Sequence, residues 1–179
     1  MKHSTRRTLL LLTACLLLTP DRAVAQDHEH VSPYAGDEAR DIKALSAEEI
    51  EGLLEGRGMT LALPAELNGL PGPKHVLEMK SELNLTSDQE RMVQTVFDAM
   101  IATAREQGAH IVELERRLDR EFADRTITED TLDEILAALA VHRASLRASH
   151  LKAHLKLLPI LTDEQRMHYN RLRGYAAHG

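Results

Sequence analysis

The sequence predicts an all-α fold: a long antiparallel helical hairpin with shorter flanking helices, in a four-helix, cradle-like arrangement. Two observations lead to this prediction. The pattern L-T-x-[DE]-Q occurs twice, at residues 85–89 and 161–165, and each copy opens a helical stretch. Between the copies, apolar residues recur at helical spacing along two long segments that a short polar break separates.

Each copy of the pattern has the composition of a capping box. The threonine hydroxyl is expected to accept a hydrogen bond from the third amide of the helix, and the glutamine side chain to bond back to the cap residue. The leucine before the cap can pack on the first turn and fix the angle at which the chain enters the helix. The motif residues are Leu85, Thr86, Gln89, Leu161, Thr162 and Gln165.

The first 25 residues have the pattern of a secretory signal peptide. Three basic residues among the first seven precede an apolar stretch over residues 8–18, which is too short to cross a bilayer. The A-x-A pattern at 23–25 predicts cleavage near Ala25 and export to the periplasm. A lipoprotein processed at Cys15 is the alternative, because residues 12–15 resemble a lipobox. Cleavage at Ala25 removes four basic residues and one acidic residue, which changes the formal charge from −6 to −9.

The chain before the hairpin divides into an arm and a segment of short helices. Residues 26–45 are polar and are expected to form a flexible arm. Residues 46–72 combine short helices with a linker, starting from a capping box at Ser46 and including a helical turn near 64–67. The helical domain then spans residues 73–174, with its first helix over 74–83, and residues 175–179 form a tail.

Two long helices dominate the helical domain. The first is expected from residue 87 to about 124, with Gly108 as a candidate bend, and the second begins after Thr128. The short connection makes them antiparallel neighbours, which places His110 level with His142. The apolar seams expected to join the helices are Val93, Phe97, Met100, Ala104, Ile111, Leu114, Leu118 and Phe122, and Leu132, Leu136, Leu139, Leu146, His150, Ala153, Leu157 and Ile160.

Composition excludes several functions. The chain is acidic, has no tryptophan and contains only 3% aromatic residues, so it has neither the basic face nor the stacking side chains of a nucleic-acid-binding protein. No nucleophile elbow or phosphate-binding loop is present, and no catalytic residues are assigned. We therefore expect a protein that is not an enzyme.

The two motif copies, with the signal sequence and a mature chain free of cysteine, resemble the Spy/CpxP family of periplasmic proteins. This resemblance covers roughly residues 75–174. The superfamily, named for its LTxxQ motif, also includes periplasmic metal-resistance and metal-sensing proteins. The resemblance implies an ATP-independent chaperone or envelope stress adaptor, a homodimer that holds unfolded or misfolded clients on a concave face and needs no cofactor. A membrane sensor protein is a further candidate partner.

Histidines provide three candidate metal sites. A mature terminus Gln26-Asp27-His28, with His30 nearby, would offer the nitrogen ligands that Cu(II) or Ni(II) prefers. Inside the hairpin, His110 and His142 with Glu113 or Glu106 could hold zinc. The third site is the pair His150 and His154, spaced i, i+4 on one helix. Each has a plainer interpretation: a solvated acidic tail, half-exposed histidines at the rim of the seam, and a neutral packed histidine.

The second long helix is apolar on two sides near its end. Leu151, Leu155 and Leu158 lie on a different face from the seam residues, and a helix that is apolar on two sides must bury both. The extra face is therefore a client-binding or dimer surface, or ordinary core.

Three functional hypotheses remain from the sequence. The leading one is a periplasmic chaperone or stress adaptor that captures unfolded chains without nucleotide. The alternative is a periplasmic protein that binds or senses Zn, Cu or Ni through its histidines. The third is structural packing with no separate site.

Overall fold

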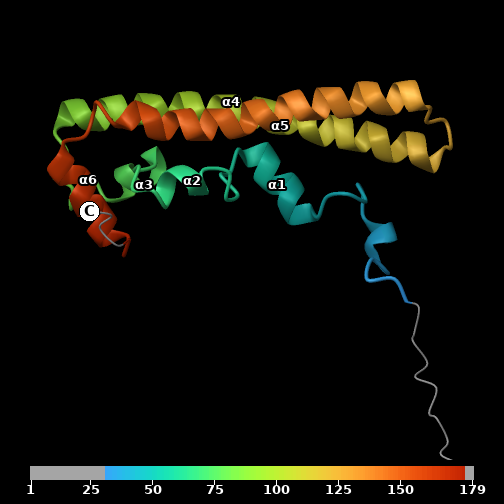
Figure 1. Cartoon of the computed structure of the whole chain (residues 1–179), viewed down its shortest axis with the longest axis horizontal. Helices are drawn as coiled ribbons and strands as arrows, with labels where there is room; N and C mark the ends of the chain where they lie inside the picture. Colours follow the sequence, from blue (N-terminus) through green and yellow to red (C-terminus); the bar gives the residue numbers. More distant parts are fainter. Residues whose placement is uncertain (1–30, 176–179) are drawn as a thin grey trace, which may run out of the picture. The chain divides into compact units, whose positions relative to one another are not determined.

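The computed structural model describes residues 31–175, and two long helices form its framework. Helix α4 spans Ser87–Ala123 and helix α5 spans Glu129–Leu157, and they lie side by side in opposite directions (Figure 1). The described residues contain no strand beyond an isolated bridge between Ile42 and Leu45. The predicted all-α hairpin is therefore confirmed.

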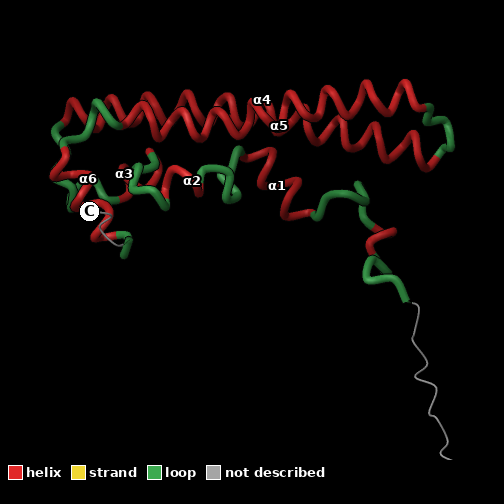
Figure 2. Tube along the Cα trace, viewed as in Figure 1, coloured by secondary structure: helices red, strands yellow, loops and turns green. Residues whose placement is uncertain are grey.

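Shorter helices precede and follow the hairpin in the sequence, as Figure 2 shows. Before it come the 3₁₀ turn η1 (Asp37–Ala39), α1 (Ala47–Glu55), α2 (Leu63–Glu66) and α3 (Pro73–Glu78), and after it comes α6 (Asp163–Leu172). Within residues 73–174 the helices are α3, α4, α5 and α6, which is the four-helix arrangement expected for that segment. The helix expected over 74–83 ends earlier, because Met79 already leaves the helical conformation.

Local sequence explains where these helices begin. A complete capping box opens α1 at Ser46, α4 at Thr86, α5 at Thr128 and α6 at Thr162. In each, the cap hydroxyl accepts from the third helical amide, and the side chain three residues on accepts from the cap amide, so two otherwise unpaired amides are satisfied. Helix α5 ends at Leu157, two residues before Pro159.

The segment from α1 to α3 lies along one side of the hairpin (Figures 1 and 2). Helix α1 packs on α4 where Gly108 faces Leu53. The candidate bend at Gly108 stays a prediction; α4 continues through this residue without a break, and the glycine allows the close approach of two backbones. The absent side chain is what allows α1 to reach the hairpin.

Two apolar clusters hold the elements together. One joins α1 and the middle of the hairpin through Leu53, Ala104, Ile111, Val112, Ile135, Leu139 and Leu146, and it also contains Ile42 and Leu45. The other joins α3, α6 and the open end of the hairpin through Val76, Leu83, Val93, Leu157, Leu161 and Tyr169. Ile42 and Leu45 fall within the arm expected to be flexible over 26–45. Their burial anchors the last residues of that range, because two large apolar side chains leave water there.

The predicted seams are correct along most of their length and wrong toward the tip of the hairpin. Phe122 and Leu136 are 55% and 46% exposed, whereas Ile135 is fully buried. Ile135 and Leu139 are four residues apart on the stripe that faces the core, and Leu136 lies about 100° further around the helix. The leucine spacing misled the prediction because both stripes are apolar.

Candidate functional site

The two motif glutamines meet at the open end of the hairpin. The side-chain amide of Gln89 donates to Oε1 of Gln165 at 2.8 Å, and that of Gln165 donates to Oε1 of Gln89 at 3.0 Å. Each amide also donates to a distant backbone carbonyl, that of Ile160 at 2.8 Å for Gln89 and that of Leu83 at 3.2 Å for Gln165. The motif therefore caps two helices and also joins their first turns.

This pairing explains why a glutamine suits the third helical position of both boxes. Each Oε1 accepts from the cap amide, at 3.0 Å for Thr86 and 3.0 Å for Thr162, while each Nε2 donates across to the other box. A carboxylate could cap, but it has no hydrogen to donate. The sequence predicted the caps, but it contained no sign of the reciprocal bond, which depends on how the helices pack.

Glu66 of α2, which no sequence motif indicates, is a buried carboxylate that connects α2 to the C-terminal segment of the described chain. Its Oε1 accepts from the Tyr169 hydroxyl at 2.6 Å, the Tyr175 hydroxyl at 3.0 Å and Nε of Arg173 at 3.2 Å. Burial, followed by the bond to Glu66, raises the pKa of Tyr169. Glu66 thus ties α2 to α6 and to the residues that follow it.

The pair His150 and His154 lies beside Glu66, on the side of α5 that faces the α1–α3 segment. Both rings are buried, and Nε2 of His150 has no hydrogen-bond partner. Nδ1 of His154 donates to the carbonyl of Leu70 at 2.8 Å and lies 4.0 Å from Oε2 of Glu66. Burial, with a smaller contribution from His154, lowers the pKa of His150, which favours a neutral imidazole. The structure therefore brings a carboxylate from a distant segment close to the predicted histidine pair.

A glycine makes room for this histidine cluster. A methyl group on Gly72 would lie 2.9 Å from Cε1 and 3.1 Å from Nε2 of His154. The breaker sequence before α3 therefore also allows the backbone to pass against the imidazole ring.

The other predicted histidine pair is level across the hairpin, as its positions in the two helices suggested. The rings of His110 and His142 stack with centroids 4.6 Å apart and planes inclined by 26°. Nδ1 of His142 lies 2.8 Å from Oε1 of Gln107. Glu113 does not bond to either histidine; instead it accepts hydrogen bonds from Arg116 at 3.2 Å and from Arg120 at 3.3 Å. These bonds, that from Arg120 first, lower the pKa of Glu113.

The described residues thus contain two histidine pairs without a completed metal site. Within residues 31–175, no group of three or more histidine, cysteine, aspartate or glutamate side chains is arranged to hold a metal ion. The arm histidines His28 and His30 lie outside the described residues. Zinc, copper and nickel binding therefore stays a prediction.

A family model described as "LTXXQ motif family protein" matches residues 72–173, more than half of the 179-residue chain. The chain belongs to the LTXXQ motif family. This is the Spy/CpxP-type periplasmic family, so the resemblance inferred from the sequence is confirmed. No curated protein and no solved structure matches the chain.

Membership supports a periplasmic, non-enzymatic helical protein in broad terms. None of the helices described for this LTXXQ protein combines the length and apolar character needed to span a membrane. The family spans both chaperone-type and metal-resistance-type proteins, so the choice between these functions depends on the particular surfaces of this chain.

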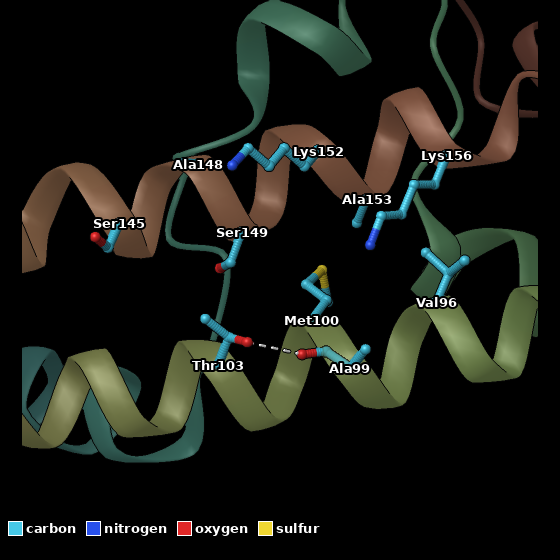
Figure 3. Close-up of a pocket in the computed structure, with 10 residues that line it drawn as sticks. All are labelled: Val96, Ala99, Met100, Thr103, Ser145, Ala148, Ser149, Lys152, Ala153 and Lys156. Atoms are coloured by element: carbon cyan, nitrogen blue, oxygen red, sulfur yellow. Dashed lines mark hydrogen bonds between the residues drawn. The ribbon is translucent and has the colours of Figure 1, made fainter.

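One such surface is a groove between the two long helices of the LTXXQ protein (Figure 3). It has a volume of about 330 Å³. Small side chains form most of its lining, Met100 points into it, and Lys152 and Lys156 stand along the α5 side (Figure 3). The groove is therefore narrow and largely uncharged inside, with two ammonium groups beside it.

A second surface, near the end of α5, is apolar. Helix α5 buries Ala153 and Leu157, while Leu155 and Leu158 are 55% and 36% exposed and Leu151 is partly buried. The two-sided character expected near the end of α5 is therefore present, with one side packed and the other open to solvent. Other large apolar side chains exposed on the hairpin are Met92, Phe122, Leu136 and Val141.

Proposed function

We propose that this LTXXQ protein is an ATP-independent periplasmic chaperone or stress adaptor that holds unfolded chains against its hairpin. The observation that carries the proposal is the exposed apolar side of α5, represented by Leu155 and Leu158. Contiguous apolar surface rimmed by polar residues is typical of interaction sites, and Leu155 and Leu158, three residues apart, stay exposed among the described residues.

The groove between α4 and α5 supports the same function. Its small lining residues leave space for an apolar client side chain, and Met100 is a flexible contact that adapts to different shapes. Lys152 and Lys156 would attract acidic client segments despite the net negative charge of the chain. Such contacts are individually weak, which suits capture followed by release without nucleotide.

The hairpin also carries ion pairs along α4 and between α4 and α5. Arg117 bonds to Glu121 at 2.9 Å and to Glu134 at 3.1 Å, and Arg143 bonds to the buried Glu115 at 2.6 Å. Ion pairs of this kind, spread over the helices, favour solubility of the free protein while single apolar side chains remain accessible.

Aggregation of a chemically unfolded substrate protein tests the proposal. We expect the purified chain to suppress light scattering at equimolar ratio with chelator present and ATP absent. Leu155→Ser with Leu158→Ser should reduce this suppression at least twofold. The matched control is Leu54→Ser, which removes a similarly exposed leucine from α1 and should leave suppression unchanged. Lack of suppression by the unmodified chain would rule out the chaperone function.

The same double variant tests the expected homodimer. If Leu155 and Leu158 form the contact between two copies, analytical ultracentrifugation will show dissociation together with loss of suppression. If they contact clients, the oligomeric state stays the same while suppression falls. The two measurements therefore separate a client surface from a dimer surface.

The second candidate function is metal binding at His150 and His154. It is favoured by the unpartnered Nε2 of His150 and by Glu66 close to His154. An imidazole pair with one carboxylate is a ligand set that zinc accepts, with water as the fourth ligand. Binding would need the side chains to move closer together, and that movement would be the signal passed to a membrane sensor protein.

Calorimetric titration with zinc and copper tests this candidate. We expect submicromolar affinity that is lost in His150→Ala if α5 holds the metal. His110→Ala is the matched control, because its ring belongs to the other histidine pair. Affinity that survives His150→Ala but disappears in His28→Ala would assign the metal to the N-terminal arm.

A further inference from the structure

A second, larger cavity lies between the α1–α3 segment and the hairpin. It has a volume of about 680 Å³, within the range of roughly 300–1,000 Å³ that is usual for small-molecule sites. The loop after α1, the start of α3, one side of α4 and one side of α5 each contribute to its lining. The cavity is thus an open cleft bordered by elements from both halves of the described chain.

One wall of this cavity is apolar. Phe97, Met100 and Ile101 of α4 line it, and each is only partly buried by protein. Met59 and Leu63 contribute from the opposite side, and they are 37% and 43% exposed. Five large apolar side chains therefore border a space that protein atoms do not fill, and an apolar ligand would remove them from water.

The acidic side chains that line the cavity are paired with arginines, whereas one lining arginine has no carboxylate partner among the described residues. The two lining carboxylates are already paired, Glu55 with Arg57 at 2.7 Å and Glu66 with Arg173 at 3.2 Å. Arg105 also lines the cavity, but it forms no ion pair with any carboxylate of residues 31–175. The cavity therefore retains a positive charge although the chain as a whole is acidic.

Arg105 is also held in place. Its Nε donates to the backbone carbonyl of Glu55 at 3.2 Å, which is a neutral acceptor. The guanidinium charge is therefore not offset by this neutral acceptor. The terminal N–H groups of the guanidinium form the flat donor pair that matches a carboxylate. At the inner side of the cavity, the buried His150 leaves Nε2 unpartnered.

We propose that this cavity binds an aliphatic carboxylate, with the carboxylate on Arg105 and the hydrocarbon chain along Phe97, Met100 and Ile101. A single free guanidinium beside a long apolar wall matches one flat anionic group joined to one apolar tail.

The other cations that line the cavity, Arg57, Lys74 and Arg173, each pair with a carboxylate. A phosphate-rich ligand would therefore find only one lining cation without a carboxylate partner among residues 31–175. The cavity shares Met100 with the groove between α4 and α5, but neither Leu155 nor Leu158 lines it, and the proposal does not depend on the chaperone function.

Calorimetric titration of the purified chain with decanoate, below its micelle concentration and with chelator present, tests the proposal. We expect saturable binding of one decanoate per chain, with affinity that rises about fourfold for each methylene added between hexanoate and decanoate. Decanol, which has the same tail without the charge, should bind at least tenfold more weakly.

Two substitutions test whether Arg105 binds the carboxylate of decanoate. Arg105→Gln should weaken decanoate binding at least tenfold, because the charge-assisted bond is lost. The matched control is Arg147→Gln, which removes an exposed arginine of α5 that pairs with no carboxylate of residues 31–175 and does not line this cavity. Circular dichroism confirms that both variants are folded. The proposal is overturned if the folded chain does not bind decanoate, or if Arg105→Gln binds it as well as Arg147→Gln does.

Discussion

Gly108 of α4 lies directly against the backbone of Leu53 in α1. A methyl group on Gly108 would sit 2.0 Å from the carbonyl oxygen of Leu53 and 2.6 Å from its carbonyl carbon. No side chain fits there, because the obstructing atoms belong to the backbone of another helix. This contact fixes the closest approach of the α1–α3 segment to the hairpin.

Replacing this glycine by alanine should therefore destabilise the protein. Gly108→Ala would ordinarily stabilise a helix by up to about 1 kcal/mol, because glycine is a poor helix former. Here α1 must shift, and we expect a net loss of about 1–3 kcal/mol in the free energy of unfolding. Urea unfolding measures the sign, and hydrogen exchange over residues 47–55 should become faster. A stabilised variant would contradict the close packing of α1 on α4.

The reciprocal bond between Gln89 and Gln165 predicts energetic coupling between the two motif copies. Gln89→Ala and Gln165→Ala each remove half of one capping box and one side of the bridge. In a double-mutant cycle we expect the two changes to deviate from additivity by about 0.5–3 kcal/mol.

A matched cycle provides the control for this coupling. Thr131→Ala impairs the capping box of α5, whose contacts are local to Thr128. Combined with Gln89→Ala, it should be additive within about 0.5 kcal/mol. Equal coupling in both cycles would show that the measured effect is not specific to the motif pair.

Neutralising Glu66 should loosen the contact of α2 with α6 and with the residues that follow α6. Glu66→Gln leaves Arg173 without its carboxylate and weakens the bonds from Tyr169 and Tyr175, so we expect a loss of about 1–3 kcal/mol. Glu78→Gln is the matched control. Its carboxylate is exposed and forms only surface pairs, so the change should stay within about 0.5 kcal/mol.

The buried His150 predicts a loss of stability in mild acid. Burial lowers the pKa of His150 in the folded chain below its ordinary value of about 6.5. As the pH falls below that value, the unfolded chain takes up a proton that the folded chain resists, so the free energy of unfolding decreases. Above that value, the shift contributes no pH dependence.

Unfolding midpoints between pH 5 and pH 8 measure this effect. His150→Leu should change stability near pH 7.5 by no more than about 1 kcal/mol, because it removes an imidazole nitrogen that has no partner. The same variant should lose less stability than the unmodified chain on acidification. Parallel curves for the two proteins would exclude His150 as the source of the acid sensitivity.

The sequence predicted those parts of the fold that depend on neighbouring residues. Thr86, Thr128 and Thr162 begin helices because a cap bonds only to the next three residues. The sequence also predicted that His110 and His142 lie opposite each other on the two long helices, because a short connection leaves little freedom in the register of the hairpin. The family resemblance depended on the same local motifs.

Tertiary structure decided the features that join distant segments. The bridge from Gln89 to Gln165, the burial of Ile42 and the bonds to Glu66 each involve residues far apart in the chain. Ile135 rather than Leu136 faces the core because both stripes of α5 are apolar, so the sequence alone does not determine which side packs. Caps and helical periods are local and can be predicted from the sequence, whereas the choice among equally apolar or polar partners depends on packing in three dimensions.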